Sequence, residues 1–242
     1  SVNGMITIEG KKMSKSKGIF TTISKEIRKY GADVVRAALI YGAEGMDDPD
    51  WNENIARLME QKIAFLFEFI NEIRGISSHR EKDFPEKLLL AEVKNMILLI
   101  EKNLEQMKTK TAFQIAFFDI PNVIKRYLRQ VPVPEKGTIE EVLEYWIKAM
   151  APFIPFTCEE LWHLIGRQGY ISLEKWPILT ISEEDNRVLF EHKLIEQLLE
   201  DVREIKKVTK TEPKTLYIYV ATQELTKAFL KYVTYFDEGL TT

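Results

Sequence analysis

Residues 52–73 read NENIARLMEQKIAFLFEFINEI and carry apolar side chains at spacings of three and four. Because an α-helix completes a turn in 3.6 residues, this spacing collects the apolar side chains on one face. The members of this face are Ile55, Leu58, Met59, Ile63, Leu66, Phe67, Ile70 and Ile73. Residues 52–73 therefore predict a long amphipathic helix, whose apolar face must pack against other elements.

The chain downstream of residue 73 repeats this pattern. Apolar spacing predicts helices over residues 86–107 and 111–128, and Pro121 predicts a kink in the second of them. Two further helices are expected over residues 139–150 and 155–165. Five helices with short connections predict a helix bundle.

The chain upstream of residue 52 contains shorter elements. Residues 5–8 predict a strand, and residues 24–30 and 33–41 predict two short helices. Asp33 is expected to begin or cap the second of these helices and to meet Arg36 on the same helix face. This part of the chain therefore predicts a small α/β segment.

The end of the chain changes pattern again. We expect a polar-rich helix over residues 183–207, a strand over residues 215–220 and a helix from residue 223 to about residue 232. Because one strand is not stable alone, this part predicts the start of an α/β domain that the chain end cuts short.

These patterns predict a mainly α fold with three parts. The acidic stretch 44–50, with one glycine and one proline, predicts a linker. We therefore expect an α/β segment over residues 1–50, a helical domain over residues 51–181 and the start of a small α/β domain over residues 182–242.

The composition bounds the class of protein. The 242 residues hold 34 lysines and arginines against 37 acidic residues, and the net charge of −3 excludes a generally cationic nucleic-acid coat but not a local basic face. The single cysteine, Cys158, and three histidines lack the spacing of zinc ligands, and a lone thiol fits a reducing cytosol. No apolar run approaches the roughly 18 residues of a membrane span, so we expect a cytoplasmic protein without a membrane partner.

The strand near Ser1 has nothing before it to pair with, so we expect a fragment.

Residues 10–18, GKKMSKSKG, hold four lysines and two serines between two glycines. A segment this polar cannot bury itself and is expected to form an exposed, mobile loop. Ammonium groups, hydroxyls and backbone N–H groups bind phosphate oxygens, and long lysine stems with flexible glycines let such a loop close on them. The pattern indicates phosphate chemistry, and the plainer interpretation is a solvated lysine-rich surface loop.

Five residues of this loop carry a resemblance to a known family. Lys12, Met13, Ser14, Lys15 and Ser16 match the KMSKS signature of class I aminoacyl-tRNA synthetases letter for letter. Residues 30–36 (YGADVVR) resemble the class Ia branch, and residues 151–156 (APFIPF) with residues 159–162 (EELW) resemble its anticodon-binding helical domain. Segments 43–51, 116–121 and 198–205 look most like its leucyl members of archaeal and eukaryotic cytosolic type. One departure is Ile19, where the family usually has asparagine.

The resemblance implies an activity. Such enzymes activate an amino acid with ATP and Mg²⁺ and transfer it to tRNA, here leucine and tRNA(Leu). It implies that Lys12 and Lys15 are catalytic, that the five signature residues contact ATP with Lys15 foremost, and that residues 51–181 are an anticodon-binding-type bundle. The His-x-Gly-His signature of class I chemistry is absent from this sequence. We therefore expect the leucine pocket to lie outside this chain, and the chain alone to be inactive.

Two groups of cations are candidates for contact with tRNA. They are Lys206, Lys207, Lys210 and Lys214 after the long polar helix, and Lys125, Arg126 and Arg129 near the end of the helix expected over residues 111–128. The positive charges of either group match the negatively charged phosphate backbone of tRNA. Cations at a helix end also complement the helix dipole without binding anything, so both interpretations stay open.

Two alternatives remain from the sequence. The lysine loop and the bundle segment are shared by isoleucyl-, valyl- and methionyl-tRNA synthetases, so any of these is an alternative specificity. A free-standing helical RNA-binding or assembly module with a relict loop is an alternative of another class.

Overall fold

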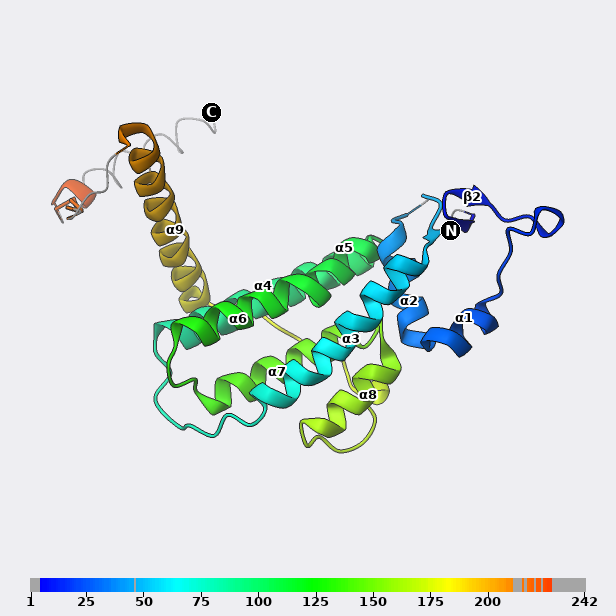
Figure 1. Cartoon of the computed structure of the whole chain (residues 1–242). Helices are drawn as coiled ribbons and strands as arrows, with labels where there is room; N and C mark the ends of the chain where they lie inside the picture. The colour runs from blue at the N-terminus through cyan, green and yellow to red at the C-terminus, as the bar shows by residue number, and fades with distance from the viewer. Residues whose placement is uncertain are drawn as a thin grey trace, which may run out of the picture. The chain divides into compact units, whose positions relative to one another are not determined.

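The computed structural model describes residues 5–45, 47–210, 215, 217–219, 221–222 and 224–227, and most of these residues lie in helices (Figure 1). The predicted mainly α fold class is confirmed. The described residues up to 193 form one compact unit, and those from 194 onward belong to a second. The domain boundaries expected after residues 50 and 181 stay predictions.

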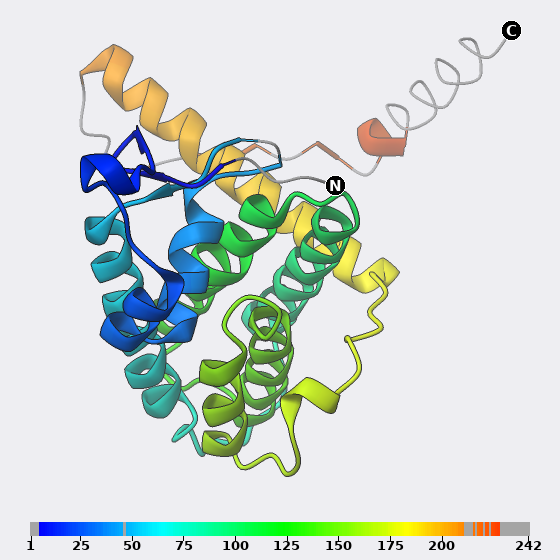
Figure 2. The ribbon, with the colours of Figure 1, turned by 90° about the vertical axis from the view of Figure 1, so that its right-hand side faces the viewer.

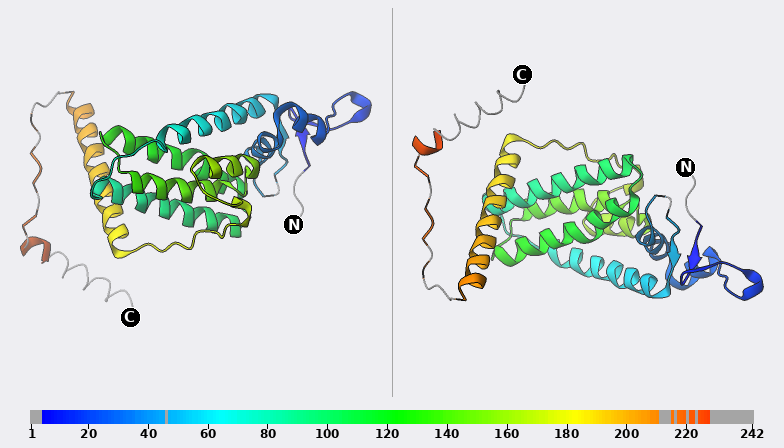
Figure 3. Two further views of the ribbon diagram at one scale, coloured as in Figure 1. Left: turned by 90° about the horizontal axis from the view of Figure 1, so that it is seen from below. Right: turned by 90° about the horizontal axis from the view of Figure 1, so that it is seen from above.

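Five helical stretches form the bundle, as the apolar spacing predicts. Four of them are α3 (Glu53–Ile73), α4 (Phe84–Glu105), α7 (Lys136–Met150) and α8 (Pro155–Leu164). They lie side by side in two perpendicular views (Figure 2, Figure 3). The fully buried side chains of the core include Met59, Leu66, Ile97, Phe113, Ile124, Ile139 and Trp146. These come from α3, α4, α7 and the fifth stretch, so the helices share one core.

The fifth stretch changes from α-helix to a π-turn just before Pro121, and the predicted kink at this proline stays a prediction. The stretch consists of α5 (Thr109–Gln114), the π-helical turn η2 (Ile115–Asp119) and α6 (Ile120–Gln130). In a π-turn each carbonyl accepts from the N–H group five positions on, and residue 121 has no N–H group. The carbonyl of Ala116 instead accepts from the indole N–H of Trp146 at 2.7 Å. A side chain from α7 thus supplies the hydrogen bond that the proline cannot.

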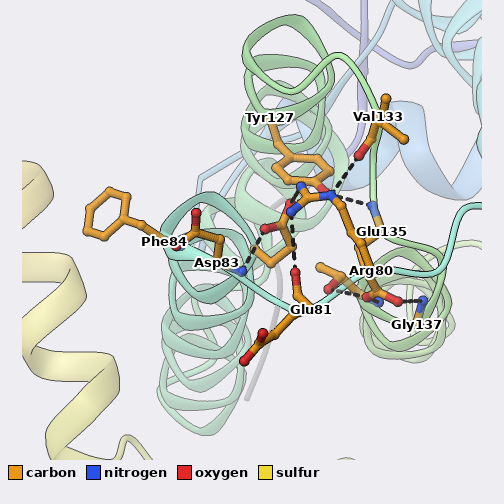
Figure 4. A network of polar contacts seen from close by, with 10 residues as sticks. Arg80, Glu81, Asp83, Phe84, Tyr127, Val133, Glu135 and Gly137 are labelled. Atoms are coloured by element: carbon orange, nitrogen blue, oxygen red, sulfur yellow. Dashed lines mark hydrogen bonds and ion pairs between the residues drawn. The ribbon is translucent and has the colours of Figure 1, made fainter.

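A polar network closes the end of the bundle where α4, α6 and α7 meet (Figure 4). Glu86 is fully buried, pairs with Arg80 and accepts from the Tyr127 hydroxyl at 2.6 Å. The same hydroxyl accepts from the backbone N–H of Glu135 at 3.0 Å. Burial, together with the hydrogen bond to Glu86, raises the pKa of Tyr127. Because these polar groups form hydrogen bonds and an ion pair with one another, the network fixes the three helix ends relative to one another.

Three two-residue strands lie near the start of the chain. They are β1 (Thr7–Ile8), β2 (Lys11–Lys12) and β3 (Asp50–Trp51), in the order β2-β1-β3. β1 is antiparallel to β2 and parallel to β3. The strand predicted over residues 5–8 is thus confirmed at residues 7–8, and both of its partners follow it in the chain. The two predicted short helices are confirmed as α1 (Ile23–Tyr30) and α2 (Ala32–Gly42).

α2 is tied to the connection between α7 and α8. Asp33 is buried and accepts from the backbone N–H of Thr157 at 2.5 Å. Arg36 donates to the carbonyls of Pro152 and Phe153 at 2.9 and 3.1 Å. The expected pairing of Asp33 with Arg36 is therefore wrong, because each side chain finds a backbone partner more than a hundred residues away.

α9 (Glu183–Thr209) starts against α4. Glu184 pairs with Lys87 at 2.8 Å, and Asp185 pairs with Lys94 at 3.3 Å. The strand predicted over residues 215–220 is not formed by its described members, since residues 215 and 217–219 lie in neither helix nor strand. Residues 216 and 220 lie outside the described part of the chain. Of the helix expected from residue 223, residues 224–227 are helical, and residues 223 and 228–232 are not described.

Candidate functional site

The lysine loop, defined here as residues 10–22, projects beside α1 (Figure 1). Its tip is a tight hairpin, in which the backbone N–H of Ser14 donates to the Ile19 carbonyl at 2.7 Å and the N–H of Ile19 returns to the Ser14 carbonyl at 3.1 Å. A single 3₁₀ turn, η1 (Lys15–Lys17), fills the tip, and Gly18 closes it with φ of +70°. The segment is therefore a hairpin; its exposure agrees with the sequence prediction, and its mobility stays a prediction.

The tip gathers cations and hydroxyls. Lys12 is exposed in β2, and Lys15 lies 5.1 Å from the ring centroid of Phe20. The hydroxyls of Ser14 and Ser16 are 3.1 Å apart. Within the described ranges, none of the loop's four lysines forms an ion pair with a carboxylate. Such an arrangement can receive a multiply charged anion without first breaking an internal ion pair.

Ile19, the position that departs from the family, contributes its backbone to the hairpin and its side chain to a hollow of about 290 Å³ behind the loop. The hollow is also lined by Lys11, Lys25 and Glu26. The departure thus leaves the backbone pairing of the tip intact and adds apolar surface to the hollow.

Two carboxylates lie at the ends of the loop. At its start, one oxygen of Asp50 accepts from the backbone N–H of Gly10 at 2.8 Å and from the Thr7 hydroxyl at 2.6 Å. At its end, Glu26 accepts from the Thr21 hydroxyl. The sequence analysis did not single out Asp50 or Glu26. A two-residue strand leaves no periodic signal, so no pattern in the sequence placed Asp50 beside Gly10.

α1 is fixed to the bundle by a surface ion pair. Lys29 donates to Glu53, the first residue of α3, at 2.8 Å. The hydrogen bond to Glu53 raises the pKa of Lys29 to about 12, and the same contact lowers the pKa of Glu53. The helix that follows the loop thus has a defined position on α3.

The structure separates the three cations of α6 that are candidates for contact with RNA. Lys125 lies over the ring of Phe65 at 4.1 Å, and Arg129 is exposed one turn further on. Both line one surface hollow. Arg126 instead forms an ion pair with Glu92 of α4. Only Lys125 and Arg129 therefore share a surface that a ligand can approach.

Three cations of the second group, Lys206, Lys207 and Lys210, lie around the C-terminus of α9. Lys206 and Lys207 belong to its last turn, and Lys210 follows the helix with φ of +52°. Lys214 lies outside the described residues. The placement of Lys206 and Lys207 is the one in which lysines complement a helix dipole, so it does not distinguish an RNA contact from a structural role.

In the described part of the chain, no three His, Cys, Asp or Glu side chains gather into a metal site. Cys158 is a free, buried thiol whose pKa is raised by burial. No helix within the described ranges is both long and apolar enough to span a membrane.

Comparison with known proteins identifies two families along the chain. A model described as the anticodon-binding domain of tRNA ligase matches residues 86–218, which is more than half of the chain. A model described as tRNA synthetases class I (M) matches residues 1–71 and so includes the lysine loop.

Individual relatives agree with these families. A leucine–tRNA ligase of Pyrococcus abyssi is 35% identical over 91% of this chain and 24% of its own length. One of Methanococcoides burtonii is 34% identical over 99% of this chain and 25% of its own length. The chain thus spans about a quarter of the curated relatives that it matches. A solved ternary complex, LeuRS-tRNA-LeuAMS of Agrobacterium radiobacter, has a TM-score of 0.65 at 21% identity, covering 77% of this chain and 24% of its own chain, and so shares the fold.

Proposed function

We propose, from the premise that the chain belongs to the family of tRNA-ligase anticodon-binding domains, that it is part of a leucine–tRNA ligase. The complete protein would activate leucine with ATP and transfer the leucyl group to tRNA(Leu). The observation that carries this proposal is the lysine loop, whose Lys12 and Lys15 stand exposed and without carboxylate partners among the described residues. Similarity to leucine–tRNA ligases over nearly the whole chain supports the choice of leucine.

The chemistry explains why the loop needs these residues. Activation is an in-line attack by the leucine carboxylate on the α-phosphorus of ATP, which forms leucyl-adenylate and releases pyrophosphate. Negative charge grows on the leaving phosphates as the bond to the α-phosphorus breaks. The ammonium groups of Lys12 and Lys15 and the hydroxyls of Ser14 and Ser16 would stabilise that charge. Mg²⁺ would arrive with the phosphates of ATP as part of the substrate.

The helical part of the chain would dock tRNA(Leu). Lys125 and Arg129 on α6 are the better candidates of their group, because Arg126 is already paired. Lys206, Lys207, Lys210 and Lys214 form the second candidate group. The cytoplasm, where tRNA is charged, is the location we propose, and the free thiol of Cys158 is compatible with it.

The activity is tested by amino-acid-dependent exchange of pyrophosphate into ATP, using the complete ligase. We expect exchange with leucine to exceed exchange with isoleucine, valine and methionine. Preference for one of the other three would replace leucine by that amino acid, and the absence of exchange with all four would refute the proposal.

The tRNA contacts are tested by binding of tRNA(Leu) to two double variants of the same protein. Lys125→Ala with Arg129→Ala probes α6, and Lys207→Ala with Lys210→Ala probes the end of α9. Each lost phosphate contact should reduce the slope of log affinity against log salt by about 0.7 to 0.9. Arg126→Ala, which breaks an internal ion pair, should leave that slope unchanged. If a double variant keeps the salt slope of the unmodified protein, the surface that it alters is not part of the proposed interface.

A further inference from the structure

The start of the lysine loop is a turn that glutamate rarely adopts. Glu9 and Gly10 connect β1 to β2, with φ of +50° and +72°. Two consecutive positive φ values identify the tight two-residue turn of a hairpin, in which asparagine or glycine usually occupies the first position. Glu9 therefore holds a conformation that needs support from outside the hairpin.

Asp50 supplies that support. Its Oδ1 atom accepts from the backbone N–H of Gly10 at 2.8 Å, inside the turn, and from the hydroxyl of Thr7 at 2.6 Å, in the strand before it. Asp50 lies in β3, which pairs in parallel with β1 and places its side chain 40 residues away in sequence against the turn. One carboxylate oxygen thus accepts hydrogen bonds both from strand β1 and from the turn at which the lysine loop begins.

The other end of the loop has a matching anchor. Glu26 of α1 is 5% exposed, and its Oε1 accepts from the hydroxyl of Thr21, just before the helix. Its second oxygen is buried and has no hydrogen-bond partner within the described ranges. Glu26 lines the hollow behind the loop together with Lys11 and Lys25. Both ends of the loop therefore rest on carboxylates that belong to other elements.

We propose that Asp50 and Glu26 are positioning residues for the lysine loop, which hold its two ends so that Lys12 and Lys15 reach the phosphates of ATP in a defined geometry. Neither carboxylate touches a reacting atom. Their contribution is to the placement of the ammonium groups, and a catalytic group displaced by an ångström loses most of its effect. The inference rests on the proposed function for its kinetic test, and hydrogen exchange tests it independently.

The test compares Asp50→Ala with Asp50→Asn in the complete ligase. We expect Asp50→Ala to lower the single-turnover rate of leucyl-adenylate formation at saturating ATP by about 10- to 100-fold, with a much smaller change in the ATP concentration needed for half saturation. Asp50→Asn keeps an oxygen that accepts from Gly10 and Thr7, so it should restore most of the rate. Amide exchange over residues 10–20 should accelerate in Asp50→Ala and stay slow in Asp50→Asn.

Asp48→Ala is the matched control. Asp48 is a carboxylate two positions away that accepts from the backbone N–H of Met5 at 2.6 Å, outside the loop, so its loss should change neither rate nor loop exchange. If Asp50→Ala behaves like Asp48→Ala in both measurements, the inference is wrong. A complete ligase that does not activate leucine would refute the proposed function, and the exchange comparison would still decide whether Asp50 holds the loop.

Thr21→Val covers the case in which Asp50→Ala does not fold. It exchanges the hydroxyl that Glu26 accepts from for a methyl group, at a partly buried position. We expect faster amide exchange over residues 18–22 and a several-fold lower adenylate rate at saturating ATP. A wild-type rate together with wild-type exchange in Thr21→Val would overturn the role of Glu26.

Discussion

At the scale of single residues, Lys15 lies at the tip of the hairpin, within the only turn of η1. Its ammonium group lies over the ring of Phe20, a weak contact that an arriving phosphate can replace. Lys17 occupies the other end of the same turn, so the two lysines have similar exposure and different positions. Substituting each lysine in turn therefore distinguishes the effect of losing one positive charge from the effect of losing it at a particular position in the turn.

We predict that Lys15→Ala lowers the rate of leucyl-adenylate formation about 100- to 1,000-fold at saturating ATP, since contacts made on closure are strongest in the transition state. Single-turnover kinetics in the complete ligase measure this rate. Lys17→Ala, the control, should mainly change the ATP concentration needed for half saturation, because the loop loses one positive charge that attracts ATP. A Lys15→Ala defect that disappears at high ATP would assign Lys15 to ground-state binding, and no defect would leave the loop a solvated surface.

At the scale of elements, side chains satisfy backbone groups that lack a helical partner, at the start of α7 and in the π-turn η2. Trp146 donates to Ala116 in the π-turn, and Glu135 caps α7 by accepting from the backbone N–H groups of Gly137 and Thr138. The Trp146 contact joins residues 30 positions apart, whereas the Glu135 contacts are local, two and three positions apart. Each can be tested by one substitution that removes the donor or the charge of the side chain.

Trp146→Phe should destabilise the protein by about 1 to 3 kcal/mol, because it leaves the buried Ala116 carbonyl without a donor. The free energy of unfolding in urea measures the loss. Trp162→Phe is a suitable comparison, since Trp162 is also buried but its indole makes only a long hydrogen bond of 3.4 Å to the Gln168 carbonyl. Equal effects of the two substitutions would show that ring volume, and not the hydrogen bond, accounts for the loss.

Glu135 predicts a pH dependence of stability. Burial opposes its ionisation, but the hydrogen bonds from Thr138 and Gly137 outweigh burial and lower its pKa below the ordinary value of 4.5. The unfolded chain therefore binds a proton more readily than the folded one, so the stabilisation is complete above about pH 4.5 and is lost as pH falls through the folded pKa. Glu135→Gln should cost about 0.5 to 2 kcal/mol at pH 7, and the difference from the unmodified protein should shrink in acid.

Thermal unfolding measured from pH 7 to pH 3 checks this expectation. Glu140→Gln, an exposed glutamate on the same helix that faces Lys136 at 3.6 Å, serves as the control and should have a small effect throughout. A loss in Glu135→Gln that is the same at every pH would contradict the assignment to the ionised carboxylate.

At the scale of the compact unit formed by residues up to 193, the lysine loop is connected to the bundle through α1 and α2. Arg36 of α2 contacts the segment between α7 and α8, Asp33 contacts the first turn of α8, and Lys29 of α1 pairs with Glu53 of α3. The first of these contacts joins parts of the chain 116 residues apart. The position of the loop relative to the helical bundle depends on them.

Arg36→Ala should destabilise this unit by about 1 to 3 kcal/mol, because two carbonyls lose a charged donor. It should also accelerate amide exchange around residues 152–157. Arg36→Lys should recover part of the stability, since one ammonium group cannot reproduce the planar fork that reaches both carbonyls. Arg28→Ala, at an exposed position of α1, is the control and should be near neutral. Exchange that stays unchanged around residues 152–157 in Arg36→Ala would contradict a linking role for this side chain.

The sequence by itself determined the helices of the bundle and the chemistry of the loop. Helical periodicity repeats every few residues, so residues 52–73 specify their own apolar face, and residues 12–16 carry their charges and hydroxyls wherever the loop lies. Only the tertiary structure decided that Asp50 meets Gly10, that Arg126 is paired while Lys125 and Arg129 face a surface hollow, and that the helix before Pro121 opens into a π-turn beside Trp146. Each of these contacts joins residues 30 or more positions apart, and local periodicity carries no information about the register in which distant segments pack.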